Sequence, residues 1–191
     1  MSPLVIAVSG GSGSGKSTFV KLLCQKFDAD KILTLSQDHY YKDCSHLSVA
    51  QRDTLNFDDP ERIDHQMLTE HLEALTHNQS IERPTYDFTQ HIRKEHQEEI
   101  HPRPVIILDG IFTLYFEKIR QLSKLKLFIE VDDDLRFIRR LKRDMTERER
   151  SMDQIISQYV NTVKDSYTSF VEPTKRFADF LIFWKDINHS S

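Results

Sequence analysis

The chain has 191 residues, of which 38% are hydrophobic and 29% charged, a balance typical of one globular domain with a sizeable core rather than a disordered chain. Its formal net charge of −4 argues against bulk binding of nucleic acid, which needs a basic surface. The two cysteines have no metal-ligand spacing and form no disulfide framework, so a reducing cytoplasm is expected, and no stretch resembles a signal peptide or a membrane span.

Short apolar runs and helical patterns alternate along the chain. The expected strands are 4–9, 31–37, 105–109, 126–131 and 179–184. The expected helices are 16–27, 61–77, 114–122, 133–146 and 151–170. This alternation predicts an α/β fold, a three-layer sandwich in which helices cover both faces of a five-stranded parallel sheet. We expect a single domain over 1–191, with a lid and following helix at 133–170.

One segment departs from this pattern. Residues 80–103 are polar, interrupted by prolines and without a long apolar run. We expect this segment to leave the main sheet as a β-hairpin.

The first strand runs directly into SGGSGSGKST, residues 9–18, which holds four of the five glycines. The composition resembles a flexible linker, but a linker has no reason to join a buried strand to a helix. The stretch also satisfies the phosphate-binding pattern G-x-x-x-x-G-K-[ST], in which inward-turned backbone N–H groups and a helix N-terminus hold an anion. The expected nucleotide-binding residues are Gly10, Gly11, Ser12, Gly13, Ser14, Gly15, Lys16, Ser17 and Thr18. Lys16 would reach the phosphates, and the Ser17 hydroxyl would bind Mg²⁺.

Two carboxylates follow predicted strands. Asp38 comes after the second strand and Asp109 ends the third, so both should face the crevice at the carboxyl edge of the sheet. A lone aspartate is normally a cap or loop residue, but the strand and the phosphate loop favour Asp109 as the acid that holds Mg²⁺. Asp38 is placed to accept the proton of a hydroxyl acceptor, a role that a GTPase would not need there.

An arginine-rich helix is predicted over 133–146. One face carries Arg136, Arg139, Arg140 and Arg143. Such a run is usually a solvated face. Apolar residues on the same helix are Leu135, Ile138, Leu141 and Met145. We expect that apolar stripe to be buried, which would leave the arginines free to face a triphosphate.

Several longer motifs occur together: GGSGSGKS, QDHYYKDCSHLS, NFDDP, PTYDFTQHIRKE, IILDGI, RRLKRDMTERER and SMDQIISQYVNTVK. Their order and spacing resemble those of the uridine kinase (uridine–cytidine kinase) family, bacterial type, within the P-loop kinase superfamily. The resemblance covers nearly the whole chain.

The resemblance implies roles for individual residues. Asp38 would be the base for the nucleoside 5′-hydroxyl and would lie near Mg²⁺ with Ser17 and Asp109. At the ribose, the substrate residues would be Asp58, Arg140 and Arg150, and the pocket would be shaped by Tyr41 and Phe57. Tyr86 and His91 would contact the pyrimidine edge, and Phe88 and Ile111 would line the slot that holds the base. Gln158 would complete the substrate side. Arg143 and Arg148 would contact the phosphates, which makes Arg143 catalytic with Asp38 and Lys16. Taken by itself, His91 is more simply a surface histidine.

The implied activity is transfer of the γ-phosphoryl group of ATP or GTP to the 5′-hydroxyl of uridine or cytidine, giving UMP or CMP in pyrimidine salvage. Mg²⁺ would be the cofactor, and the tetramer common among relatives suggests a homo-oligomer. Alternatives are a kinase of another small alcohol and a nucleotide-binding relative with reduced activity. A GTPase-like switch is disfavoured, because Asp109 opens DGIF rather than D-x-x-G and no N-K-x-D stretch occurs.

The chain departs from the family pattern at three places. Asp109 stands where the family usually has Glu, and Glu149 stands where it typically has Gly. The family's last strand runs into a Pro-Arg-Gly segment and a final helix, whereas this chain reads LIFWKDINHSS. That segment borders the nucleotide base in the family, so the choice between ATP and GTP stays open.

Overall fold

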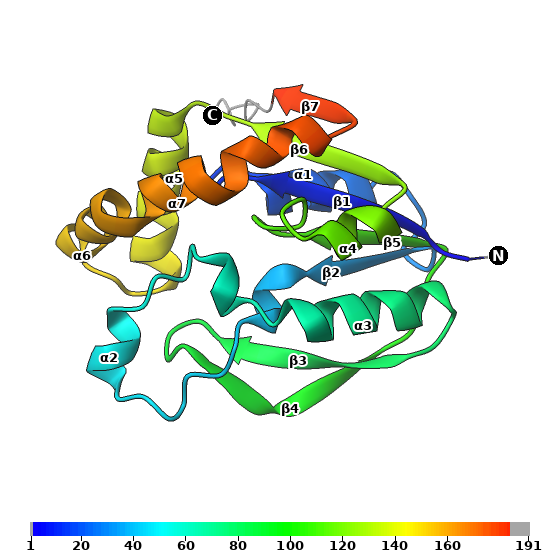
Figure 1. The fold of residues 1–191 in the computed structure, drawn as a ribbon, viewed down its shortest axis with the longest axis horizontal. Coiled ribbons are helices and arrows are strands. Elements are labelled where there is room, and N and C mark those ends of the chain that lie inside the picture. Colours follow the sequence, from blue (N-terminus) through cyan, green and yellow to red (C-terminus); the bar gives the residue numbers. More distant parts are fainter. Residues whose placement is uncertain (1, 184–191) are drawn as a thin grey trace.

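A five-stranded parallel sheet forms the centre of the computed structural model, which describes residues 2–183 (Figure 1). Its strands, in the order in which they pair, are β2 (Ile32–Ser36), β5 (Val105–Asp109), β1 (Leu4–Gly10), β6 (Leu125–Glu130) and β7 (Phe180–Phe183). All four pairings are parallel, as the sequence predicts. Trp184, the last residue of the predicted fifth strand, lies outside the described residues.

Successive side chains along each strand point alternately into two apolar layers, one on each face of the sheet. On β1, Val5 and Ala7 join the larger cluster, whereas Val8 joins the smaller one. On β5, Ile106 and Leu108 face one side and Ile107 the other. This alternation of period two explains why the strands are apolar at nearly every position.

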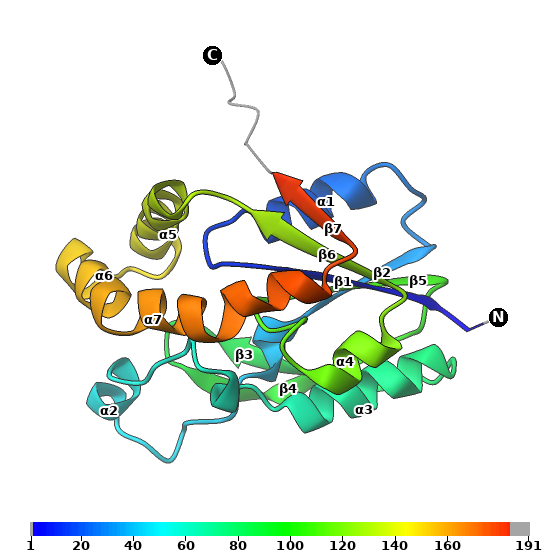
Figure 2. The same cartoon turned by 45° about the horizontal axis from the view of Figure 1, so that its top comes forward.

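Helices cover both faces, which confirms the three-layer architecture (Figure 2). Helix α1 (Lys16–Cys24) contributes Val20 to the smaller cluster. The other layer contains α3 (His65–Thr76) and α4 (Glu117–Leu122). All three are shorter than predicted. Pro60 fixes a 3-10 turn, η2 (Pro60–Arg62), before α3, and Asp64 caps α3 by accepting a hydrogen bond from the Met67 N–H.

Two further short helices were not predicted. The 3-10 helix η1 (Gln37–Tyr40) follows β2 directly, and α2 (Val49–Asp53) starts at a capping box formed by Ser48 and Gln51. Both lie in the stretch between the second predicted strand and the second predicted helix.

The last helical region is one continuous rod with irregular turns. It runs through α6 (Met152–Gln158), the π-helical η3 (Tyr159–Val163), α7 (Lys164–Ser166), the π-helical η4 (Tyr167–Val171) and the 3-10 helix η5 (Glu172–Phe177). The helix predicted over 151–170 is therefore present, but two π-helical segments interrupt its α-helical winding. Wider π turns of this kind occur frequently at functional sites.

The predicted hairpin is confirmed. Strands β3 (Ile81–Asp87) and β4 (Ile92–Ile100) pair antiparallel in a separate two-stranded sheet. Figure 1 shows this sheet lying beyond α3, away from the parallel sheet. Ile81 and Ile100 at its base belong to the larger apolar cluster, whereas its tip reaches toward the carboxyl edge of the main sheet. Within residues 2–183, no helix is long and apolar enough to cross a membrane.

Helix α5 (Asp133–Glu147) corrects one prediction about burial. Its fully buried residues are Arg136, Arg140 and Asp144, whereas Leu135, Ile138 and Met145 of the predicted apolar stripe are exposed. The charged face can be buried because opposite charges offset the cost of removing it from water. The Arg140 guanidinium lies between the carboxylates of Asp58 and Asp144.

The residue after the C-cap of α5 adopts a left-handed conformation. Glu149 has φ 54°, which an L-residue other than Asn or Gly enters at a cost of roughly 1–2 kcal/mol. We expect Glu149→Gly to raise the free energy of unfolding by about 0.5–1 kcal/mol. Glycine carries no strain in this conformation, and this gain exceeds its larger loss of chain entropy on folding. Urea denaturation measures the effect. Glu147→Gly, at a helical position two residues earlier, should lower the free energy of unfolding, so equal signs would contradict the explanation.

Candidate active site

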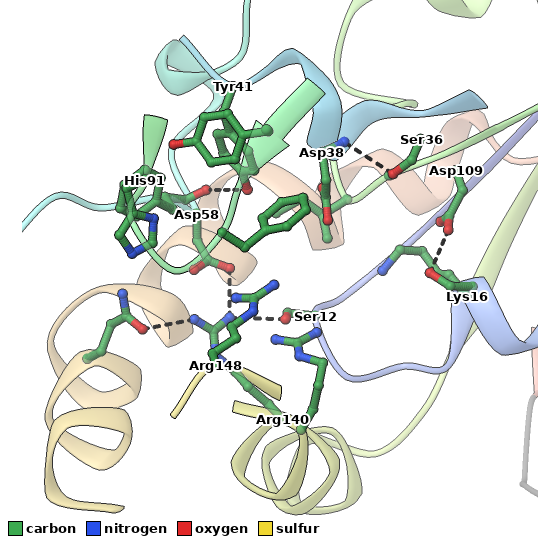
Figure 3. A pocket seen from close by; sticks show the side chains of 18 of the residues that line it. Ser12, Lys16, Ser36, Asp38, Tyr41, Asp58, His91, Asp109, Arg140 and Arg148 are labelled. Atoms are coloured by element: carbon green, nitrogen blue, oxygen red, sulfur yellow. Dashed lines mark hydrogen bonds and ion pairs between the residues drawn. The ribbon is translucent and has the colours of Figure 1, made fainter. Parts of the chain in front are cut away.

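A hollow opens at the carboxyl edge of the sheet, between the phosphate-binding loop, the hairpin tip and helix α5 (Figure 3). Counted with the open solvent at its mouth, the hollow has a volume of about 720 Å³. Its lining consists of Ser12, Lys16, Ser17, Ser36, Asp38, Tyr41, Phe57, Asp58, Tyr86, Phe88, His91, Asp109, Gly110, Ile111, Arg140, Arg143, Arg148, Arg150 and Gln158. Every residue assigned to the substrate or the metal from the sequence is therefore in this lining. Of the predicted nucleotide-binding set, Gly10, Gly11, Gly13, Ser14, Gly15 and Thr18 build the loop and the start of α1 beside it.

The sheet register brings the loop and the carboxylates together. Val8 and Ser36 both pair with Asp109, so β1 enters the phosphate loop beside the end of β5. Gly15, at φ 84°, is the N-cap of α1 and turns the chain from loop to helix. The Lys16 ammonium donates to the Gly11 carbonyl at 3.1 Å and so lies back across the loop.

Burial lowers the pKa of Lys16, although the Asp109 and Asp38 carboxylates oppose this shift. The loop therefore holds a desolvated cation among backbone N–H donors, an arrangement suited to an anionic ligand.

The oxygen ligands for a metal lie next to this lysine. The Ser17 hydroxyl donates to Oδ2 of Asp109 at 2.6 Å, whereas the buried Oδ1 of Asp109 has no hydrogen-bond partner among the described residues. Burial raises the pKa of Asp109, against the opposing effects of Lys16 and the Ser17 hydrogen bond.

No group of three or more His, Cys, Asp or Glu residues within 2–183 could hold a metal ion by itself. One or two carboxylates with phosphate oxygens are, however, the usual ligands of Mg²⁺ in phosphate-binding sites. The unpartnered oxygen and the hydroxyl beside it therefore fit Mg²⁺ bound together with a phosphate ligand.

Asp38 lies in η1, opposite the phosphate loop. The Ser36 hydroxyl accepts a hydrogen bond from its backbone N–H at 3.3 Å, which fixes the start of the 3-10 turn. Within residues 2–183 its carboxylate forms neither a side-chain hydrogen bond nor an ion pair. Figure 3 shows it at the centre of the pocket, between Lys16 and Tyr41. It is thus an acceptor available to a ligand.

Arg140 joins three walls of the pocket. Its Nη1 donates to Asp58 Oδ1 at 3.1 Å and to Ser12 Oγ at 3.0 Å, and its Nη2 donates to Gln158 Oε1 at 3.1 Å. Burial lowers the pKa of Arg140, but the carboxylates of Asp58 and Asp144 outweigh it, so the net shift is upward. The guanidinium is therefore charged and fixed.

Aromatic rings form the far end of the pocket. Tyr41 meets Phe57 edge to face with ring centroids 5.6 Å apart, and Tyr86 lies 5.3 Å from Phe88. The Tyr86 hydroxyl is buried without a hydrogen-bond partner among the described residues. Burial raises the pKa of Tyr86, so this hydroxyl stays protonated at neutral pH and can donate to a ligand.

His91 is 6% exposed, so its interpretation as a surface histidine is wrong. It stacks on Phe57 with ring centroids 4.1 Å apart and takes a left-handed conformation, φ 56°, in the hairpin turn. Nη2 of Arg150 donates to its Nε2 at 2.7 Å. Because a guanidinium only donates, this contact has Nε2 of His91 as the acceptor.

Sequence reasoning missed Ser36, Gly110 and Asp144. Ser36 and Gly110 flank predicted site residues at strand ends, so the rule that placed Asp38 and Asp109 could have found them. A Cβ on Gly110 would lie 2.4 Å from the Gln37 side chain, which explains the glycine. Asp144 lies four residues after Arg140 and four before Arg148. That spacing places the three side chains on one face of a helix and could have indicated the ion pairs.

The phosphate loop approaches the lid helix so closely that it leaves no space for a side chain. Gly13 has φ 79°, and a Cβ there would lie 2.2 Å from the backbone oxygen of Arg136. We expect Gly13→Ala to lower the free energy of unfolding by about 2 kcal/mol or more and to weaken ATP binding, measured by urea denaturation and calorimetry. Wild-type values for both quantities would contradict this close approach.

The sequence matches the model of the phosphoribulokinase / uridine kinase family over residues 5–187. The protein named uridine kinase from Chloroflexus aurantiacus is 46% identical over 179 residues, which cover 94% of this chain and 86% of that protein. The uridine kinase of Oceanobacillus iheyensis is 44% identical over 187 residues, covering 98% and 89%.

Solved structures share the fold at much lower identity. The phosphoribulokinase from Rhodobacter spheroides superposes with a TM-score of 0.67 at 15% identity, over 94% of this chain and 69% of that chain. At such identity the likeness concerns the architecture alone.

Proposed function

The chain belongs to the phosphoribulokinase / uridine kinase family of kinases, and on that premise we propose that it transfers the γ-phosphoryl group of ATP or GTP to the 5′-hydroxyl of uridine or cytidine. The observation that carries the proposal is one continuous pocket with a phosphate-binding loop at one end, an aromatic slot at the other and a carboxylate between them. Such a pocket suits a ligand that presents a hydroxyl to a triphosphate.

The phosphate end would neutralise charge. Lys16 from the loop and Arg143 and Arg148 from the α5 side line the same pocket, so the triphosphate would be held from two sides. Phosphoryl transfer depends mainly on positioning and on screening the charge of the transferred group, which these cations supply. Mg²⁺ held by Asp109 and Ser17 would add further charge neutralisation when bound.

The sugar would bind at the centre of the pocket. The Asp58 carboxylate accepts from Arg140 but keeps lone pairs for two adjacent hydroxyls, as a ribose presents. Asp38 faces the same space, so it would accept the proton of the 5′-hydroxyl as that oxygen attacks the γ-phosphorus. With Asp58 fixed by a buried ion pair, the sugar would be oriented before the chemistry.

The base would occupy the aromatic slot. Tyr86 offers an unpartnered hydroxyl that can donate to the carbonyl edge of a pyrimidine, and the His91 ring lines the same end of the pocket. The hydrogen bond from Arg150 and the stack on Phe57 would hold the His91 ring in one orientation at the base.

The deciding experiment incubates purified protein with MgATP and a panel of uridine, cytidine, adenosine, thymidine and non-nucleoside alcohols, and separates the products by chromatography. We expect UMP and CMP, with adenosine and thymidine turned over at least 100-fold more slowly. Turnover of a different alcohol without UMP or CMP would replace the proposal by another kinase activity. Nucleotide binding without any product would indicate a binding relative.

His91→Ala should raise the KM for uridine at least 10-fold and leave the KM for ATP within threefold, because the ring lies at the aromatic end of the pocket, stacked on Phe57 and away from the phosphate loop. Steady-state kinetics with each substrate varied in turn measures both constants. Gln90→Ala, an exposed neighbour in the same turn, is the control and should match the wild type. Equal rises in both KM values would argue against a role in base recognition.

A further inference from the structure

One buried carboxylate lies inside the arginine cluster of the lid. Asp144 is 0% exposed on α5, and its Oδ1 accepts from Nε of Arg143 at 2.8 Å and lies 3.6 Å from Nε of Arg148. Its Oδ2 lies 3.5 Å from Nε of Arg140. Its backbone oxygen accepts from the Arg150 N–H at 3.2 Å. Four arginines of the pocket lining therefore meet at one residue.

The arginines repel each other without this carboxylate. Burial lowers the pKa of Arg148 and the neighbouring Arg143 lowers it further, whereas Asp144 acts in the opposite direction. Burial raises the pKa of Asp144, but Arg143, Arg148 and Arg140 together lower it below its ordinary value. The carboxylate is thus ionised and offsets the crowding of like charges around the empty centre of the pocket.

The side chains of Arg140, Arg143 and Arg148 depend on Asp144 to different degrees. Arg140 has other partners in Asp58, Ser12 and Gln158. Among the residues that the structure describes, Asp144 is the one carboxylate that forms an ion pair with Arg143 or Arg148. Its loss would therefore release Arg143, whose charge acts on Lys16, and Arg148, whose guanidinium carbon lies 5.6 Å from the Phe88 ring centroid, whereas Arg140 would keep its other partners.

We propose that Asp144 is a positioning residue for phosphoryl transfer, which holds the Arg143 guanidinium group toward the phosphates, with Arg148 beside it, before the substrates bind. This inference rests on the proposed function. Its physical basis is preorganisation: cations already fixed in place screen the transferred charge without a cost of reorganisation during the reaction. Outer partners that orient metal ligands typically change affinity or activity about 10–100-fold when replaced, and we expect an effect of similar size here.

The isosteric variant Asp144→Asn removes the charge and keeps the shape. We expect kcat to fall about 10–100-fold and the KM for ATP to rise at least fivefold, a larger rise than that of the KM for uridine. Glu147→Gln, an exposed position on the same helix, removes one charge as a control and should retain wild-type constants. A general structural role would instead move the KM for uridine along with that for ATP.

A charge-balanced background keeps the test decisive if Asp144→Asn fails to fold. Arg148→Met with Asp144→Asn removes one charge of each sign, and we expect its kcat to be at least 10-fold below that of Arg148→Met alone, because Arg143 is released. In an Arg143→Met, Arg148→Met background, adding Asp144→Asn should change kcat less than threefold. A loss of 10-fold or more in that background would show that Asp144 does not act through these arginines and would overturn the proposal.

Calorimetry with MgATP separates this inference from the proposed function. If the wild type phosphorylates no nucleoside, the function is wrong, yet a fivefold weaker MgATP affinity in Asp144→Asn would still support the positioning of the arginines. If the wild type produces UMP and the Asp144→Asn enzyme equals it in kcat and MgATP affinity, the positioning role is wrong and the function stands.

Discussion

Asp38→Asn is expected to lower kcat for uridine phosphorylation by about 10²–10⁴-fold while MgATP affinity stays within threefold of the wild type. The amide keeps the shape of the side chain but cannot accept the proton of the attacking hydroxyl. The Asp38 carboxylate has neither a hydrogen bond nor an ion pair with a side chain of residues 2–183, so the fold should survive the change. Single-turnover kinetics and calorimetry provide the two measurements.

The matched control is Glu61→Gln, an exposed carboxylate in η2 that does not line the pocket. It should retain the wild-type kcat. Retained activity in Asp38→Asn would remove this residue as the base, and proton transfer would then have to go directly to the phosphate or to water. Equal losses of kcat and MgATP affinity would instead indicate damage to the phosphate site.

The largest expected effect on stability comes from Arg140→Met. The change leaves the Asp58 carboxylate, 7% exposed, without its ion-pair partner, and it removes one of the three cations around Asp144. Breaking a buried pair by removing one partner typically costs about 3–5 kcal/mol, because the remaining charge stays desolvated. We expect a decrease of about 3 kcal/mol in the free energy of unfolding, measured by urea denaturation.

Two comparison variants identify the cause. Lys142→Met, at an exposed position on the same helix, should stay within about 0.5 kcal/mol of the wild type. Adding Asp58→Asn to Arg140→Met removes the unpaired charge and should restore part of the lost stability. If the double variant is less stable than Arg140→Met alone, the packing of the arginine rather than its charge explains the loss.

The sheet and the phosphate loop were predictable because their signals are local. Each strand is a short apolar run, and Gly10 to Ser17 carries its whole geometry within eight positions. The positions of Asp38 and Asp109 followed from one topological rule, that parallel strands end at a common edge. These predictions needed no knowledge of distant contacts.

The orientation of α5 was not predictable in the same way. Periodicity shows which residues share a face of a helix, but the face that is buried depends on what lies opposite. Here Asp58, eighty-two residues from Arg140, supplies the compensating charge. Arg136 also lies over the ring of Tyr167, with its guanidinium carbon 3.7 Å from the centroid. Neither partner is visible in the helical sequence.

The far end of the pocket required the family resemblance. Tyr86 and His91 come from a polar hairpin whose own pattern gives no sign of a ligand site. Their chemistry depends on contacts across the chain, such as the bond from Arg150 and the stack on Phe57. Residue type alone favoured exposure for His91, and a tertiary contact reversed it.

The charged inner face of α5 determines how the lid responds to temperature. Lifting the helix off the phosphate loop would expose guanidinium and carboxylate groups, because the fully buried side chains of α5 are all charged. Hydrating polar surface lowers the heat capacity, whereas hydrating hydrocarbon raises it. We therefore expect a separation of α5 from the phosphate loop to carry a smaller heat-capacity change than the separation of a wholly apolar contact, so that cooling would weaken this contact less.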